Sequence, residues 1–154
     1  MALLKEGEKA PGIQGYNQDN KQITFDQFPG KKIILYFYPK DNTPGCTSEA
    51  CNLRDNYEEL RNSGFEIIGV SPDTPQSHQK FITKNNLPFH LISDPEKQII
   101  KAYGAWGEKK MFGKIKEGLL RSTFIISEDR TIEKVISKVK TKDHTEQIKE
   151  AMNK

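Results

Sequence analysis

The chain has 154 residues, with 24 lysines and arginines against 21 aspartates and glutamates and a formal net charge of +3. A chain of this length buries enough surface for one core, so we expect residues 1–154 to form a single domain. Basic and acidic residues are interleaved along the whole sequence, which argues against nucleic-acid or membrane partners. No apolar run approaches the roughly 20 residues that span a bilayer, and we expect a cytoplasmic protein.

The first half of the chain predicts a hairpin followed by two strand and helix units. Residues 13–16 and 22–25 flank a polar turn, which is typical of an N-terminal β-hairpin. Residues 32–38 form a continuous apolar run, the pattern of a strand covered on both faces. Spacing then predicts a helix over 46–62, a buried strand over 65–71 and a helix over 75–85.

The second half predicts a short strand over 89–92 and a helix that Asp94 caps and Pro95 opens, reaching residue 103. Residues 104–118 contain four glycines and predict a long loop, a feature that is usually functional. Residues 119–126 and 131–139 predict an antiparallel hairpin, and a final helix starts near Asp143. Strands separated by helices pair in parallel, while hairpins add antiparallel edges. We therefore expect an α/β fold with a mixed β-sheet flanked by helices on both faces.

Cys46 is the main candidate for chemistry. It follows a predicted strand and starts a predicted helix, at the end of the sheet where α/β proteins bind ligands. Unpaired N–H groups and the helix dipole favour a thiolate at such a position. The sequence therefore favours a nucleophile over a small buried apolar residue.

Cys51 follows five residues later. In a regular helix, Cα atoms with this spacing lie about 8–9 Å apart, whereas a disulfide requires less than about 7 Å. A bond between Cys46 and Cys51 would require the helix to unwind, so the pair would be a transient redox couple. The alternative is that Cys51 has no part in the chemistry.

The remaining candidates carry weaker signals. His78, His90 and His144 lie in three different predicted elements without metal-ligand spacing, so we expect no metal and no cofactor. Trp106, Met111 and Phe112, in the predicted loop, are compatible with a wall of a substrate pocket or with side chains that pin the loop to the core.

Pro39, Thr43 and Cys46 have the Pro-x-x-x-Thr-x-x-Cys spacing of peroxiredoxins. Cys51 stands where the bacterioferritin comigratory protein branch, also called peroxiredoxin Q, carries its second cysteine. The sequence resembles this branch over nearly its whole length, including residues 64–71, 93–95, 103–109 and 121–126. It differs at Phe112, where a tyrosine is common, and at residues 129–130, where Asp-Arg replaces a frequent Asp-Gly turn.

The resemblance implies roles for five residues. Cys46 matches the peroxidatic cysteine, Thr43 the hydroxyl that orients sulfur and peroxide, and Pro39 the residue that shields the site. Arg121 matches the guanidinium near the thiolate, where its charge and planar fork suit a developing oxyanion. Glu49 resembles an acidic residue of the branch that supports Arg121, although a solvated glutamate in the first helical turn is also compatible with the sequence.

The resemblance also implies a thioredoxin-like fold and the reduction of hydrogen peroxide and organic hydroperoxides. Cys46 would become a sulfenic acid that Cys51 resolves within the same chain. Thioredoxin or a similar thiol reductant would restore both thiols, and the cycle would need no second subunit, which favours a monomer. The alternative is a redox sensor or holdase that uses the same cysteine pair as a switch.

Overall fold

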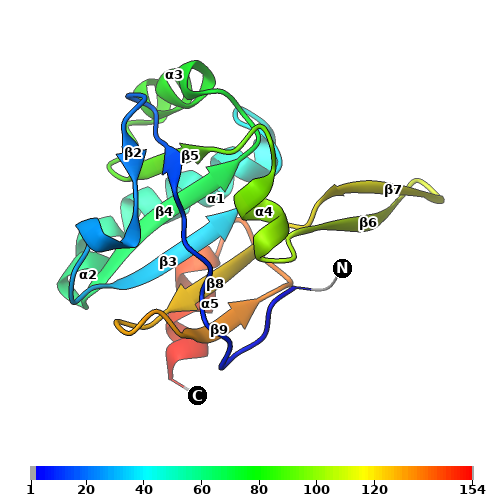
Figure 1. Ribbon diagram of the computed structural model, residues 1–154. Helices are drawn as coiled ribbons and strands as arrows, with labels where there is room; N and C mark the ends of the chain where they lie inside the picture. Colours follow the sequence, from blue (N-terminus) through cyan, green and yellow to red (C-terminus); the bar gives the residue numbers. More distant parts are fainter. Residues whose placement is uncertain (1–2, 154) are drawn as a thin grey trace.

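The computed structural model describes residues 3–153, except the side chain of Met111. These residues form a seven-stranded sheet, a separate two-stranded hairpin and five α-helices (Figure 1). The strands are β1 (Gly15–Tyr16), β2 (Gln22–Ile23), β3 (Lys32–Phe37), β4 (Phe65–Ser71), β5 (His90–Ser93), β6 (Trp106–Met111), β7 (Lys114–Leu119), β8 (Ser122–Ile126) and β9 (Ile132–Ile136). The helices are α1 (Pro44–Asp55), α2 (Tyr57–Asn62), α3 (Pro75–Asn85), α4 (Gln98–Ala102) and α5 (His144–Met152). None of the helices in this part of the chain is long and apolar enough to cross a membrane.

The large sheet is mixed, with strand order β2-β1-β5-β4-β3-β8-β9. β3 lies between β4, which is parallel to it, and β8, which is antiparallel. The short strands β1 and β2 pair as the expected N-terminal hairpin at one edge, and β9 closes the other edge. The mixed sheet predicted from the order of elements is confirmed.

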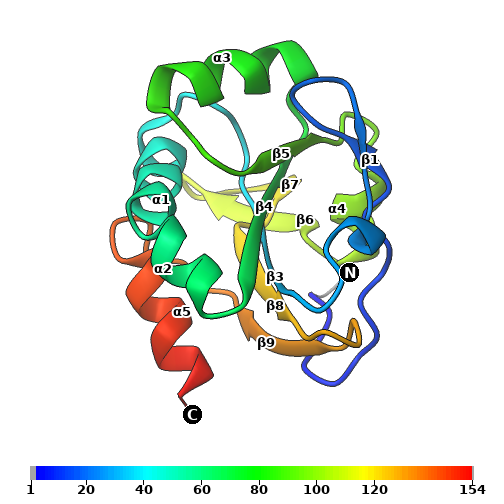
Figure 2. The ribbon, with the colours of Figure 1, turned by 90° about the vertical axis from the view of Figure 1, so that its left-hand side faces the viewer.

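Two apolar cores cover the two faces of this sheet. Along β3, Ile33, Leu35 and Phe37 belong to one core and Ile34 and Tyr36 to the other, as expected for alternating side chains. Helices α1, α2, α3 and α5 contribute to the second core, whereas α4 and the N-terminal segment cover the first (Figure 2). Helices therefore flank both faces, as predicted.

The centre of β4 contains a glycine for a steric reason. A Cβ atom on Gly69 would lie 2.8 Å from the ring of Tyr36 and 2.7 Å from the side chain of Leu91. The aromatic ring thus occupies the space of a side chain on the neighbouring strand. The glycine at position 69 therefore leaves room for the Tyr36 ring beside β4.

Two predicted helices have different bounds in the structure. The helix expected over 46–62 begins at Pro44 and is interrupted at Asn56, whose side-chain amide donates to the Asn52 carbonyl at 2.8 Å. This side-chain bond competes with the backbone bond of a continuous helix. The helix expected from Asp94 begins only at Gln98, after a turn that includes Lys97 with a positive φ. Asp94 still accepts hydrogen bonds from the Gln98 and Ile100 N–H groups.

The prediction of a long loop over residues 104–118 is wrong. β6 and β7 pair from Trp106 and Leu119 to Met111 and Lys114, and Phe112 and Gly113 form the connecting turn. This hairpin, which we call the arm, projects away from the rest of the molecule (Figure 1). Because Leu119 ends β7, the strand predicted from residue 119 begins only at Ser122.

Candidate active site

Cys46 is the third residue of α1 and is 1% exposed. The chain leaves β3, turns through Asn42 with a φ of 64°, and enters the helix at Pro44. The first intrahelical bond joins the Thr47 N–H to the Thr43 carbonyl. The N–H groups of Gly45 and Cys46 precede this bond, so the start of α1 presents the positive end of its dipole beside the thiol.

Strand register brings Arg121 to this thiol. In the antiparallel pair of β3 and β8, Ser122 lies opposite Phe37, so Arg121 comes to the C-terminal end of β3. Its Nη2 donates to the Cys46 Sγ at 3.3 Å. A Cβ atom on Gly45 would lie 3.3 Å from the same Nη2, which indicates that a larger residue would press on the guanidinium.

Glu49 occupies the other prong of the Arg121 fork. Arg121 Nη1 donates to Glu49 Oε1 at 2.8 Å, and the carboxyl group is fully buried. Burial raises the pKa of Glu49 to about 7, although the charge and hydrogen bond of Arg121 act in the opposite direction. Glu49 Oε2 has no hydrogen-bond partner within the described residues. Glu49 is therefore buried, and the alternative of a solvated glutamate in the first helical turn is wrong.

The buried side chain of His144, a residue that the sequence placed in no site, faces this carboxyl group. His144 Nε2 lies 3.5 Å from Glu49 Oε2 and 2.7 Å from the Thr123 hydroxyl, while Nδ1 lies 3.0 Å from Gln147 Oε1. Burial lowers the pKa of His144 to about 4, so the ring is neutral at pH 7. With its proton on Nδ1 toward the amide oxygen, the ring accepts from Thr123 through Nε2.

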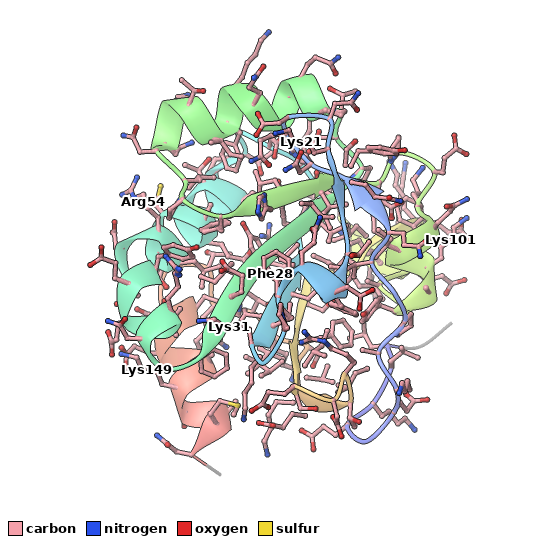
Figure 3. The ribbon with its side chains drawn as sticks, turned by 60° about the vertical axis from the view of Figure 1, so that its left-hand side comes forward. Lys21, Phe28, Lys31, Arg54, Lys101 and Lys149 are labelled. Atoms are coloured by element: carbon pink, nitrogen blue, oxygen red, sulfur yellow. The ribbon has the colours of Figure 1, made fainter. Side chains whose placement is uncertain are left out.

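Cys51 lies on the same unbroken helix as Cys46, and both cysteines are free thiols. Its Sγ is 3.7 Å from Asn85 Oδ1, in the last residue of α3. Arg54 extends from α1 toward the same residue and donates to the Asn85 carbonyl at 2.7 Å (Figure 3). The two cysteines thus have different neighbours, and the expected intact helix in the reduced protein is observed.

Thr43 and Pro39 lie in the loop between β3 and α1. Thr43 immediately precedes the helix and donates its hydroxyl hydrogen to the Lys40 carbonyl at 2.8 Å. This bond fixes the side chain and leaves the oxygen lone pairs able to accept a hydrogen bond. Pro39 is half-buried, two residues beyond the end of β3.

A second buried polar cluster lies behind this loop and was not predicted. Asp41 Oδ2 is 2.8 Å from His78 Nδ1, and the carboxylate also accepts from the hydroxyls of Tyr38 at 2.6 Å and Ser77 at 2.7 Å. The other ring nitrogen of His78 lies 3.0 Å from the Ile92 carbonyl. Both ring nitrogens therefore lie within hydrogen-bond distance of oxygen atoms from other elements.

Asp73 joins this cluster and completes a set of possible metal ligands. Ligand atoms of Asp41, Asp73 and His78 lie within 4.8 Å of one another. However, Asp73 Oδ2 already accepts from the Asp41 N–H and the Ser71 hydroxyl. The arrangement fits a hydrogen-bonded network that joins the loop before α1 to the end of β4 and to α3.

Trp106 and Phe112 have different surroundings. Trp106 is half-buried against the first core, and Lys97 Nζ lies 5.0 Å from its ring centroid, so it pins the base of the arm. Phe112 is 98% exposed and forms no pocket wall, and the side chain of Met111 lies outside the described part of the chain. Lys109, in the middle of β6 with its side chain over Gly118, has its pKa lowered by burial and by the charge of Arg121. The sequence had no signal that placed Lys109 near the site.

A mixed sheet with a cysteine at a helix start, beside an arginine at the end of a central strand, defines a thioredoxin-like thiol enzyme. Comparisons with known proteins identify the family. Residues 7–135 match the AhpC/TSA family. Peroxiredoxin Bcp of Escherichia coli strain K12 is 42% identical over 144 residues, covering 94% of this chain and 92% of the relative. Peroxiredoxin Bcp of Bacillus subtilis strain 168 is 45% identical over 141 residues, covering 92% and 90%.

The fold agrees with this result. The solved structure of peroxiredoxin Q from Xanthomonas campestris matches with a TM-score of 0.84 at 33% identity, covering 92% of this chain and 89% of that one. The chain therefore belongs to the AhpC/TSA family and is a peroxiredoxin, an enzyme of the thiol-dependent peroxidase class.

Proposed function

We propose that this enzyme reduces hydrogen peroxide and organic hydroperoxides with Cys46 as the peroxidatic cysteine. The observation that carries the proposal is the 3.3 Å contact between Arg121 Nη2 and the Cys46 Sγ at the start of α1. The Cys46 thiolate attacks the terminal peroxide oxygen, forming an S–O bond as the O–O bond breaks. The sulfur is oxidised by two electrons to a sulfenic acid, and the leaving alkoxide or hydroxide takes up a proton.

The neighbouring residues have distinct roles in this step. Arg121 stabilises the thiolate and the negative charge that develops on the leaving oxygen. The Thr43 hydroxyl accepts a hydrogen bond from the peroxide, which orients it for attack, and Pro39 shields the site from water. Glu49 fixes the guanidinium through its 2.8 Å bond to Nη1.

Cys51 resolves the sulfenic acid. Its thiolate attacks the Cys46 sulfur, a disulfide forms, and water is released after proton uptake. Thioredoxin or a similar dithiol reductant then returns two electrons and restores both thiols. The position of Cys51 on the same helix, with a half-buried thiol, supports resolution within one chain.

The cycle requires no second subunit, and we take the enzyme to act as a monomer in the cytoplasm, where its two cysteines return to thiols between turnovers. The proposal that residues 1–154 are one domain is supported by the large sheet, which gathers strands from Gly15 to Ile136.

Peroxide consumption in the presence of thioredoxin, thioredoxin reductase and NADPH tests the function. We expect many equivalents of peroxide to be consumed by the wild type, none by Cys46→Ser, and about one to two equivalents by Cys51→Ser, as Cys46 becomes a sulfenic or sulfinic acid. Mass spectrometry of the oxidised wild type should show a bond between Cys46 and Cys51 within one chain. If the wild type consumed only about one equivalent of peroxide in this reducing system, the result would favour the redox sensor or holdase instead.

A further inference from the structure

The tip of the arm combines two unfavourable features in one residue. Phe112 and Gly113 form the two-residue turn between β6 and β7, with φ values of 52° and 77°. Such turns favour asparagine and glycine, and a bulky residue with positive φ is strained. The Phe112 ring is nevertheless 98% exposed, and Ile115, three residues further on, is 67% exposed. Strain and exposed apolar surface at one point indicate a function outside the fold.

Lysines surround these apolar side chains. Lys109, Lys110, Lys114 and Lys116 lie within eight residues, and no acidic residue separates them. Lys109 and Lys116 are directly opposite each other across the two strands, an arrangement of like charges that destabilises a hairpin. Glu108 and Glu117 are opposite each other nearer the base of the arm, and the hairpin gathers Lys110, Lys114 and Lys116 beyond them at its far end. An anionic partner would relieve this repulsion.

The shape of the arm limits the kind of partner. Figure 1 shows a narrow two-stranded hairpin that extends beyond the body, with its turn at the far end. A convex tip with an apolar ring at its apex and cations behind it suits a surface that yields on insertion, as the interface of a bilayer does. Another copy of the chain would bring a second set of lysines to the same place.

We propose that the arm docks this enzyme on an anionic lipid surface. Phe112 and Ile115 enter the interface between headgroups and acyl chains, and Lys110, Lys114 and Lys116 remain at the level of the lipid phosphates. The chain continues from Leu119, the last residue of β7, to Arg121, so a docked arm holds the reactive thiol about one strand length, roughly 20 Å, from the lipid surface. This last consequence rests on the proposed function, whereas the docking itself does not.

Co-sedimentation with vesicles tests the docking without any enzyme turnover. The probes are vesicles of phosphatidylcholine alone and vesicles in which one third of the lipid is phosphatidylglycerol. We expect binding to the anionic vesicles that weakens with salt, and little binding to the neutral ones. Phe112→Ser with Ile115→Ser should weaken binding at least tenfold, and each of Lys110→Gln and Lys114→Gln about fivefold.

Tyr16→Ser is a matched control, because Tyr16 is the other large apolar residue that is exposed in the described part of the chain, at 52%, and lies away from the arm. Its binding should equal that of the wild type. All these variants should reduce hydrogen peroxide at the wild-type rate, which also shows that they are folded. If peroxidase activity were absent from every form, the proposed function would fail while the vesicle result still stood.

Three results would overturn the docking. One is equal binding of the wild type to neutral and anionic vesicles, or none to either. Another is unchanged binding by the Phe112 and Ile115 double variant and by both lysine variants. The third is self-association of the wild type in sedimentation velocity that the double variant loses, which would make the arm a contact between copies of the chain.

Discussion

In the proposed function, Arg121 is the residue in direct contact with the reactive thiol. Its planar guanidinium donates one hydrogen bond to Cys46 Sγ through Nη2 and another to Glu49 Oε1 through Nη1. A lysine at this position would supply the charge but only one prong, because its ammonium group has no fixed fork. The side chain therefore contributes geometry as well as charge.

We expect Arg121→Ala to lower the second-order rate of Cys46 with hydrogen peroxide by about 10²–10³-fold, the usual loss for one donor to a developing oxyanion. Arg121→Lys should recover part of this loss. Stopped-flow measurement of Cys46 oxidation gives the rates, and Arg61→Ala, on α2 and away from the thiol, is the control. A native rate in Arg121→Ala would mean that the ion pair with Glu49 is structural.

Glu49 and His144 form a pair whose effects on stability have opposite signs. The pKa of Glu49 is raised from 4.5 to about 7, so the folded protein holds a proton that the unfolded chain loses above about pH 4.5. The titration of Glu49 therefore lowers the free energy of unfolding as pH rises from about 4.5 to 7. The pKa of His144 is lowered from 6.5 to about 4, so here the unfolded chain holds the extra proton. The titration of His144 therefore raises the free energy of unfolding as pH rises from about 4 to 6.5.

We therefore expect Glu49→Gln to gain stability relative to the wild type as pH rises from about 4.5 to 7, by up to about 1.4 kcal/mol per pH unit. His144→Gln should lose stability relative to the wild type between about pH 4 and 6.5. Urea unfolding at a series of pH values measures both differences. Parallel pH curves for the wild type and Glu49→Gln would show that Glu49 titrates normally in the folded protein.

At the scale of elements, the proposed disulfide between Cys46 and Cys51 requires a change in α1. The helix runs without interruption from Pro44 to Asp55, and residues five apart on a regular helix are too distant for a disulfide. Between Cys46 and Leu53 the buried side chains are few, namely those of Cys46, Glu49, Ala50 and Leu53. Opening this segment should cost a few kcal/mol, in the range of local unfolding.

We expect amide hydrogen exchange across residues 46–53 to rise strongly when the disulfide forms, while β3 and β4 remain protected. Exchange measured by mass spectrometry on the reduced and peroxide-treated protein checks this. Cys51→Ser should keep the helix after oxidation and accumulate sulfenic or sulfinic acid on Cys46. Unchanged protection in a protein whose disulfide is confirmed by mass would show that α1 bends without melting.

The turn between β8 and β9 shows how an unusual residue is accommodated. Arg130 has a φ of 65°, a conformation that glycine adopts more easily. Its guanidinium donates to the carbonyls of Lys31 and Phe28, both at 2.7 Å, and lies 5.2 Å from the Phe25 ring centroid. These contacts offset the backbone strain and explain why an arginine is tolerated where a glycine is frequent.

At the scale of the whole molecule, the buried pair of Asp41 and His78 connects parts of the chain that are distant in sequence. Asp41 belongs to the loop before α1, His78 to α3, and the second nitrogen of His78 contacts β5 at Ile92. Both members of the pair are almost completely inaccessible to solvent. Removing one member of such a pair leaves its buried polar partners without hydrogen bonds, which is costly.

We expect Asp41→Ala to lower the free energy of unfolding by about 3–5 kcal/mol. Glu133→Gln, which breaks the more exposed pair of Lys32 and Glu133, should cost less than about 1 kcal/mol. Urea denaturation followed by circular dichroism gives both values. If the two variants lost the same small amount, water or rearranged neighbours would be compensating His78.

Sequence by itself determined the elements whose signals are local. Continuous apolar runs predicted β3 and β4, and proline at the first helical position predicted α3 over its full length. The spacing of Pro39, Thr43 and Cys46 indicated the family, because these three residues lie in one short segment and their pattern can be read without the tertiary structure. Prediction failed at residues 104–118, where glycines suggested a loop although both strands of the arm pair in register.

Tertiary structure decided which distant residues meet. The register of β3 and β8 brings Arg121 to Cys46, and the packing of α5 brings His144 to Glu49. The same packing removes Glu49 and His144 from water, which shifts their pKa values in opposite directions. These contacts and pKa shifts depend on distances between elements and on burial. Neither can be read from the order of residues along the chain.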